Sequence, residues 1–265
     1  MVYSVGSFEH SHGFLGQTKV QLMAQAIPFL LDTSSEIPKF RAETFWTKEP
    51  ETIHWINRNL VESSGVDLLV DVGANIGIYS LYAATVNKSI SIFSIEPVPG
   101  TFRELNANIE LNKKTNQIST FMVALSSISG SGTLTNVDPR LGSSGAQIEF
   151  VASGDDAPTK VLSGDRLLRD KWEKNDHDIK VMIKIDTDGN ELDVLNGFIE
   201  AFLDGKIVTV LVETHPTNRN EIESFFRRLD FREDESYLSI DGHSNHRREA
   251  KGNGERTKVY VCPMA

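Results

Sequence analysis

The chain contains a single cysteine, Cys262, among its 265 residues. One cysteine cannot form an internal disulfide, and it cannot build the multi-cysteine sites that hold structural zinc. This scarcity favours a reducing compartment, so we expect a cytoplasmic protein.

Long apolar runs are also missing. The longest early run, AIPFLL at residues 26–31, is far shorter than the roughly 20 residues that a membrane span needs. The first residues include Glu9 and several histidines, where a secretory signal would need basic residues followed by an apolar core. We therefore predict a soluble protein with no membrane partner.

Positive charge is scarce as well. The 27 lysines and arginines are outnumbered by 37 acidic residues, which gives a formal net charge of −10. This balance disfavours a nucleic-acid backbone as the main partner. The hydrophobic content of 39% is enough for a full core, and the length suits one catalytic domain with an added terminal segment.

The chain lacks the three-glycine turn of dinucleotide-binding proteins, although it has a related loop. In LLVDVGANIGIYSLYAA, residues 68–84, an apolar run ends at Asp71, and Gly73 and Gly77 precede a helical apolar pattern. Glycines of this kind remove the β-carbons that would keep a ligand from the backbone. Phosphate would be repelled by Asp71, however, so the loop does not favour a nucleotide phosphate.

A second apolar run, SIFSI at residues 91–95, leads into Glu96. A carboxylate there can accept hydrogen bonds from both hydroxyls of a ribose. Acids at the ends of two successive strands suit an adenosyl ligand that carries a sulfonium and an amino acid, which is S-adenosylmethionine. A nicotinamide or flavin dinucleotide, or a loop that binds nothing, are the alternatives.

Strand and helix patterns alternate along the rest of the chain, which predicts a parallel α/β sheet covered on both faces. Residues 1–65 are expected to form a helical cap, and residues 66–265 the catalytic domain. Segment 130–150 reads as a short strand with an exposed loop, and the last two strands are close enough to form an antiparallel hairpin. The expected strands are 66–70, 90–96, 118–126, 181–186, 208–216, 237–242 and 257–264. The expected helices are 76–84, 100–112, 191–205 and 221–229.

Five segments together resemble the FkbM-type S-adenosylmethionine-dependent methyltransferases. They are DVGANIGIYSLYAA, IEPVPGTFRELNANIELN, VALSSISG, IKIDTDGNELDVLNG and VLVETHP, in this order and spacing, with TKEPETIHWI at 47–56 resembling the family's lead-in. The likeness covers roughly residues 40–216. It implies a Rossmann-like class I methyltransferase fold, with a mostly parallel seven-stranded sheet closed by an antiparallel hairpin. It also implies methyl transfer, most often to a hydroxyl of a sugar, polysaccharide or natural product.

The resemblance also implies roles for individual residues. The methionine end of the cofactor would be lined by Asp71, Gly73, Ala74, Asn75 and Gly77. The ribose would be held by Glu96, followed in the same site by Pro97, and the adenine would be bordered by Ala124 and Leu125. For Asn75 a helix cap, and for Ala124 a core position, are equally good interpretations. The segment TDGNE at 187–191 departs from the family, in which a valine or glutamate more often precedes the glycine.

An alcohol acceptor calls for a base or a metal, and in open α/β sheets such groups come from the carboxyl ends of strands. Asp186 follows the buried IKI run, and Glu213 and His215 end the next strand. We predict all three as catalytic residues, with His215 as the preferred base because imidazole titrates near neutral pH. His215 as a strand cap before Pro216 is the alternative. No resident metal is expected, and Mg²⁺ bound by Asp186 and Glu213 is the competing hypothesis.

The polar loop 241–257 carries Arg247, Arg248, Lys251 and Arg256 on an otherwise acidic chain. It is either a solvated loop or a lid that attracts a carboxylated or phosphorylated acceptor. The leading functional prediction is O-methylation of a carbohydrate or glycosylated small molecule. The alternatives are N-methylation, a non-catalytic binding module and a dehydrogenase.

Overall fold

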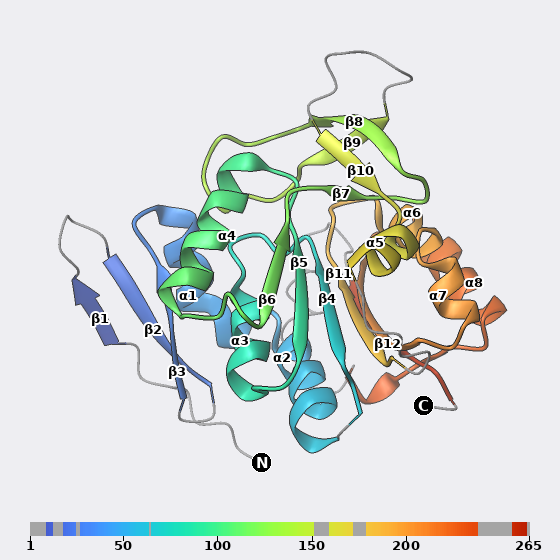
Figure 1. Ribbon diagram of the computed structural model, residues 1–265, viewed down its shortest axis with the longest axis horizontal. Coiled ribbons are helices and arrows are strands. Elements are labelled where there is room, and N and C mark those ends of the chain that lie inside the picture. Colours follow the sequence, from blue (N-terminus) through green and yellow to red (C-terminus); the bar gives the residue numbers. More distant parts are fainter. Residues whose placement is uncertain are drawn as a thin grey trace.

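The computed structural model describes residues 9–12, 18–24, 27–63, 65–150, 159–171, 179–237 and 256–263. Over these residues a seven-stranded sheet has the order β13-β14-β12-β11-β4-β5-β6 (Figure 1). Neighbouring strands from β12 to β6 are parallel, and β14 is antiparallel to both β12 and β13. The strands are β4 (Leu68–Val72), β5 (Ser91–Ile95), β6 (Ile118–Phe121), β11 (Val181–Ile185), β12 (Ile207–Thr214), β13 (Arg232–Glu233) and β14 (Arg256–Val261). The predicted fold class is confirmed.

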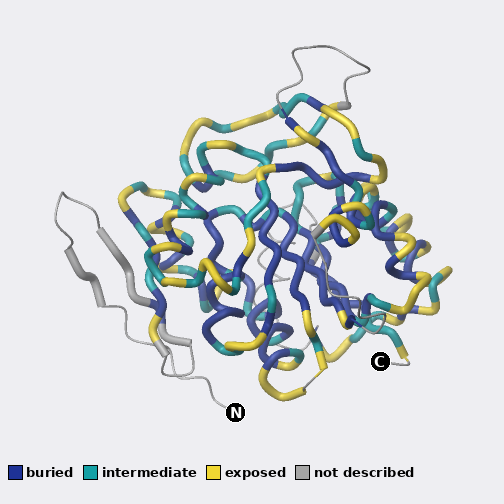
Figure 2. The backbone as a smooth tube through the Cα atoms, in the orientation of Figure 1, coloured by how far each residue is buried: buried dark blue, intermediate teal, exposed yellow. Residues whose placement is uncertain are grey.

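The central strands are buried on both faces, as continuous apolar runs predict (Figure 2). Successive residues point to opposite faces, so Leu69 belongs to one hydrophobic cluster while Leu68 and Val70 belong to the other. One cluster includes side chains of α1 (Glu36–Lys48), α2 (Pro50–Asn57), α3 (Ile78–Val86) and α4 (Pro99–Leu111). The other includes side chains of α5 (Gly164–Lys171), α6 (Glu191–Asn196), α7 (Ile199–Leu203) and α8 (Arg219–Arg228).

The helices are short, and none in the described part of the chain has the length and apolar character needed to cross a membrane. The helix predicted at 191–205 is divided into α6 and α7 by a turn at Gly197. A β-carbon at Gly197 would collide with the backbone carbonyl of Ser126, so the turn allows two chain segments to approach closely.

The N-terminal segment is only partly helical. An antiparallel sheet of β1 (Glu9–His12), β2 (Thr18–Ala24) and β3 (Ile27–Asp32) precedes α1, α2 and the π-helical turn η1 (Arg58–Glu62). The prediction of a helical cap is therefore wrong for the described residues 9–12, 18–24 and 27–32, which form strands. The side chain of Asn112, the residue directly after α4, accepts from the backbone N–H of Leu30 and donates to its carbonyl, each at 2.7 Å. This non-local pairing fixes the short apolar run as a strand.

A second sheet, which we call the roof sheet, is formed by β7 (Ala124–Leu125), β10 (Thr159–Leu162), β8 (Gly130–Thr135) and β9 (Gln147–Phe150), in that order. It lies over the carboxyl ends of the central strands (Figure 1). The predicted third strand, 118–126, is therefore split between the two sheets as β6 and β7. The prediction for 130–150 found a strand and a loop but missed the sheet that they join.

The described part of the closing hairpin is antiparallel as predicted, and it includes a short strand, β13, ahead of the predicted one. Residues 232 and 233 form β13, and Asp234 donates its backbone N–H to Val259 at 2.8 Å. Of the predicted strand 237–242 only Tyr237 is described, in the 3₁₀ turn η2 (Glu235–Tyr237). The rest of that segment lies outside the described residues.

Candidate active site

A pocket of about 870 Å³, including its open mouth, lies between the ends of the central strands and the roof sheet. The predicted residues that line it are Gly73, Ala74, Asn75, Glu96, Pro97, Ala124, Leu125 and Asp186. The predicted residues that do not line it are Asp71, Gly77, Glu213 and His215.

The glycine loop between β4 and α3 is shaped by its protein neighbours. Gly73 has a φ of +76°, and a β-carbon there would collide with the backbone carbonyl of Asp186. Gly77 has a φ of +85°, and its β-carbon would lie 2.5 Å from the side chain of Leu105. The missing β-carbons therefore admit other parts of the chain, which corrects the sequence interpretation that they admit a ligand.

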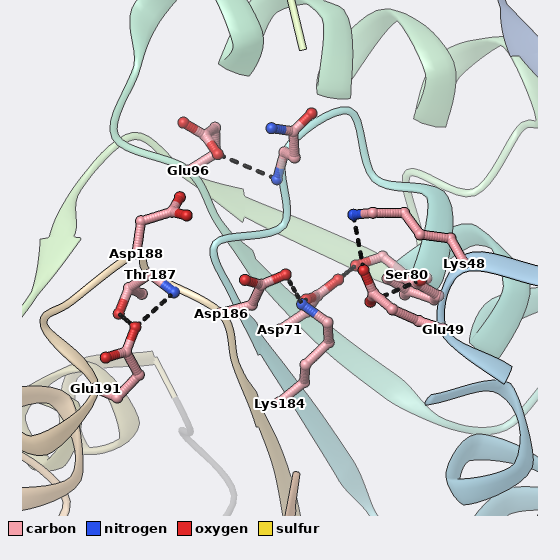
Figure 3. A network of polar contacts seen from close by, with 12 residues as sticks. Lys48, Glu49, Asp71, Ser80, Glu96, Lys184, Asp186, Thr187, Asp188 and Glu191 are labelled. Atoms are coloured by element: carbon pink, nitrogen blue, oxygen red, sulfur yellow. Dashed lines mark hydrogen bonds and ion pairs between the residues drawn. The ribbon is translucent and has the colours of Figure 1, made fainter. Parts of the chain in front are cut away.

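Glu96 follows β5 and is held by two backbone donors. The N–H of Asn75 donates to its Oε2 at 3.1 Å, and the N–H of Val98 donates to its Oε1 at 2.9 Å. Burial raises the pKa of Glu96 to about 7, although both hydrogen bonds oppose the shift. Figure 3 shows the bond from the glycine loop to this carboxylate. Glu96 is thus a fixed acceptor at one side of the pocket.

Asn75 has a left-handed φ of +52° and connects the loop to the roof. Its Nδ2 donates to the carbonyl of Ser143 at 2.8 Å, and its Oδ1 accepts from the N–H of Ile76 at 2.9 Å. The N-cap of α3 is Gly77, so Asn75 is not the helix cap that one interpretation suggested. Ala124 and Leu125, on β7, form an apolar wall together with Val123. The pocket therefore combines an acid with an apolar surface.

Lys184, which the sequence analysis did not select, lies at the centre of a buried charge cluster. It pairs in register with Asp71 across β11 and β4. Its Nζ is 3.7 Å from Oδ1 of Asp71 and 3.2 Å from Oδ2 of Asp186 (Figure 3). The ring of Tyr79 lies 5.3 Å from the same ammonium, and Ser80 donates to Oδ2 of Asp71 at 2.6 Å. Asp71 is thus buried beneath the pocket, where it holds the ammonium of Lys184.

This cluster sets the protonation of its acids. Burial raises the pKa of Asp71 even though Lys184 and Ser80 oppose the shift. Burial also acts to raise the pKa of Asp186, but the Lys184 charge and a hydrogen bond with Glu213 outweigh it and hold that pKa well below its usual range. The pKa of Lys184 is raised by Asp186, Asp71 and Glu49 against the effect of burial. Asp186 is therefore an ionised carboxylate that lines the pocket at neutral pH.

His215 belongs to a neighbouring cluster around Glu191. Its Nε2 is 3.9 Å from Oε1 of Glu191, and its backbone N–H donates to Asn218 at 2.8 Å. Glu191 also accepts from the backbone N–H of Gly189 at 2.8 Å. Glu213 contacts Asp186, as predicted from the strand ends, whereas His215 is directed to the turn that follows β11.

Asp188, the position that departs from the family pattern, connects this turn to the roof loop, residues 136–146. Its Oδ2 accepts from the N–H of Gly145 at 2.7 Å, and its carbonyl accepts from Gln147 at 2.9 Å. The φ of Asp188 is +54°. The roof loop is also bound by Arg41 of α1, whose Nε donates to the carbonyl of Gly142 at 2.8 Å.

Arg41 and Lys184 are pocket residues that sequence reasoning missed. A lysine inside the apolar IKI run was a usable signal for a buried ion pair, because charged residues are seldom fully buried alone. Arg41 lies in the segment interpreted as a cap, and nothing local distinguishes it. Arg247, Arg248 and Lys251 of the proposed lid lie outside the described residues, and Arg256 begins β14. Among the described residues no group of three or more histidines, cysteines and acids is arranged to hold a metal.

Known proteins share sequence with this chain. The curated relatives include the hexuronic acid methyltransferase AglP of Haloferax volcanii, 30% identical over 156 residues, which are 59% of each chain. The methyltransferase sdnD of Sordaria araneosa is 36% identical over 67 residues, which are 25% of this chain and 26% of that protein. The matches thus span about three fifths of the first relative's length and a quarter of the second's.

Among solved structures, the precorrin-6y C5,15-methyltransferase of Geobacter metallireducens aligns with a TM-score of 0.45 and 9% identity. This alignment covers 82% of this chain and 89% of that one. The methyltransferase FkbM domain itself matches residues 71–233, from the acid before the glycine loop to β13. The chain belongs to the family of methyltransferases that carry the FkbM domain.

Proposed function

We propose that this protein transfers the methyl group of S-adenosylmethionine to a hydroxyl of a sugar, polysaccharide or glycosylated natural product. The observation that carries the proposal is that Glu96 and Asp186 line one pocket, with the glycine loop between their strands. A ribose-binding acid and an acceptor-binding acid are thus held on one rigid sheet. Membership of the FkbM family supports methyl transfer as the chemistry.

The residues of the pocket fit an adenosyl ligand. Glu96 presents a carboxylate beside the apolar wall of Ala124 and Leu125, which suits a ribose diol next to an adenine ring. Gly73, Ala74 and Asn75 then border the methionine end. When bound, S-adenosylmethionine supplies an electrophilic methyl group on a sulfonium.

Asp186 is the residue best placed to act on the acceptor. An ionised carboxylate accepts a hydrogen bond from a hydroxyl, orients its oxygen and takes the proton as the new C–O bond forms. Its low pKa makes it a weak base, so orientation is the larger part of this role. Glu213 supports Asp186 through their hydrogen bond. Since His215 does not line the pocket, the geometry gives it less support as the base.

The name of the Haloferax volcanii relative points to a class of acceptor that should be tested first. That protein is called a hexuronic acid methyltransferase, which supports a sugar as the acceptor here. Hexuronic acids carry hydroxyl groups and a carboxylate. A hydroxyl oxygen or a carboxylate oxygen can accept a methyl group.

Calorimetry and methyl transfer test the proposal together. We expect the wild-type protein to bind S-adenosylmethionine and S-adenosylhomocysteine but not NADH, and Glu96→Gln to weaken both adenosyl ligands. Transfer from a methyl-labelled donor is then measured on hexuronic acids, neutral hexoses and aliphatic amines. Transfer only to amines would replace O-methylation by N-methylation. Binding without transfer to any acceptor favours a binding module, and binding of NADH alone would overturn the proposal.

A further inference from the structure

Arg41 brings a cation from the N-terminal segment into the pocket. It lies on α1, is half-buried and lines the same cavity as Glu96 and Asp186. Its Nε donates to the carbonyl of Gly142 at 2.8 Å, which fixes the guanidinium against the roof loop. The side chain is therefore held in the pocket before any ligand arrives.

The acids that face Arg41 are occupied by closer partners. Glu96 accepts from the backbone of Asn75 and Val98, and Asp186 lies 3.2 Å from Lys184. The charge of Arg41 acts to lower the pKa of both acids, so it lies within electrostatic reach of each. Within the described part of the chain, however, no hydrogen bond or ion pair engages its two terminal nitrogens.

Among the described residues, the other cations near Asp186 already have partners. Lys184 is buried between Asp71 and Asp186, and Lys48, two helical turns after Arg41 on α1, donates to Glu49 at 2.8 Å. A guanidinium has five N–H donors in a planar fork, and the residues that the structure describes engage only one of those of Arg41. This geometry matches the two oxygens of a carboxylate.

We propose that Arg41 is the carboxylate-binding residue of the pocket. The inference rests on the proposed function, and two ligands of that function carry a carboxylate. One is the methionine part of the cofactor, and the other is an acidic sugar acceptor. In either case α1 supplies a residue that makes the pocket selective for a ligand with a carboxylate.

Ligand pairs that differ in the carboxylate test this inference by calorimetry. S-adenosylhomocysteine carries the amino acid, whereas 5′-methylthioadenosine keeps the adenosyl thioether and lacks it. If Arg41 binds the cofactor, Arg41→Met weakens S-adenosylhomocysteine roughly 10- to 100-fold, the range of a hydrogen bond to a charged group, and leaves 5′-methylthioadenosine unchanged. If Arg41 binds the acceptor, Arg41→Met weakens glucuronic acid relative to glucose and leaves both nucleosides unchanged. Arg41→Lys, which keeps the charge but loses the fork, should fall between Arg41→Met and the wild type.

Asp138→Ala is the control for the roof loop, because Asp138 accepts from the backbone N–H of Arg140 in that loop, does not line the pocket and leaves Arg41 in place. We expect it to affect S-adenosylhomocysteine and 5′-methylthioadenosine equally. If Arg41→Met also weakens both nucleosides equally, Arg41 acts only through the loop and the inference is wrong. The inference is also wrong if Arg41→Met changes neither the affinity ratio of S-adenosylhomocysteine to 5′-methylthioadenosine nor that of glucuronic acid to glucose. Failure of the wild-type protein to bind either nucleoside would instead overturn the proposed function.

Discussion

The ammonium of Lys184 lies 3.2 Å from the carboxylate of Asp186, the residue two positions later in the chain. Residues at this spacing in an extended strand share one side. The pair therefore joins the buried centre of β11 to the pocket, and Asp71 holds the lysine from the neighbouring strand at 3.7 Å.

Lys184→Met should destabilise the protein by about 3–5 kcal/mol, because it leaves the buried Asp71 and the half-buried Asp186 without their cation. Urea unfolding monitored by circular dichroism measures the change. The double variant Lys184→Met/Asp71→Asn should lose less than the sum of the two single variants, since it removes one uncompensated charge. Lys206→Met is the matched surface control, because Lys206 pairs with Asp204 in solvent and should cost less than about 1 kcal/mol. If the stability loss of the double variant equals the sum of the losses of the two single variants, Lys184 and Asp71 are not energetically coupled.

Asp186→Asn should lower kcat on the order of 100-fold, with little change in the affinity for S-adenosylhomocysteine, because the neutral amide orients the acceptor hydroxyl less strongly and cannot take its proton. His215→Gln should lower kcat less than about 10-fold, since His215 faces Glu191 outside the pocket. Steady-state transfer and calorimetry on the same preparations separate these effects. A larger loss in His215→Gln than in Asp186→Asn would reassign the base to the histidine.

Glu96 predicts a pH dependence of cofactor binding. Its pKa is about 7 in the free protein, and only the ionised form accepts hydrogen bonds from both ribose hydroxyls. Affinity for S-adenosylhomocysteine should therefore rise from pH 6 to 8 and then level off. Calorimetry in buffers of different ionisation enthalpy should also detect proton release at pH 6.5. In Glu96→Gln both effects should vanish; if they persist, another group is responsible.

The same carboxyl influences stability with the opposite trend. Its pKa rises from 4.5 to about 7 on folding, so the folded protein binds this proton more tightly than the unfolded chain. The resulting stabilisation is complete below pH 4.5 and is lost as the pH rises through 7. The difference in unfolding free energy between wild type and Glu96→Gln should therefore shift in favour of the variant over this interval. A difference that is independent of pH would contradict the raised pKa.

Gly73→Ala should destabilise the protein and weaken cofactor binding, because its β-carbon would collide with the backbone of Asp186. Gly205→Ala is a matched control, since Gly205 has a similar φ of +68° but open space around its β-carbon. Gly205→Ala should cost about 1 kcal/mol for the left-handed conformation alone, and Gly73→Ala several times as much. Thermal unfolding measures both, and equal losses would show that the collision is relieved by movement of the loop.

Much of the central sheet could be predicted because its signals are local. The runs that form β4, β5, β11 and β12 are apolar, bounded by turns and long enough to identify. Glu96 and Asp186 were found for the same reason, as acids directly after such runs. The antiparallel hairpin followed from the short connection between the last strands, although β13, with only two residues, was not predicted.

The parts that were missed depend on contacts between distant segments. The role of Lys184 exists only because β11 lies beside β4, and β3 is bound by Asn112, which follows α4. Strand β7 is two residues long and leaves the central sheet to pair with β10, a change that no local pattern marks. Arg41 reaches the pocket through the packing of α1, so its position depends on the whole N-terminal segment.

The roof sheet begins and ends at one place in the fold. Leu125 of β7 and Leu162 of β10 are partners in a parallel pair, so the chain departs from the central framework and rejoins it at adjacent positions. The chain segment between these two residues can therefore be replaced by another segment without altering the register of the strands in the central sheet.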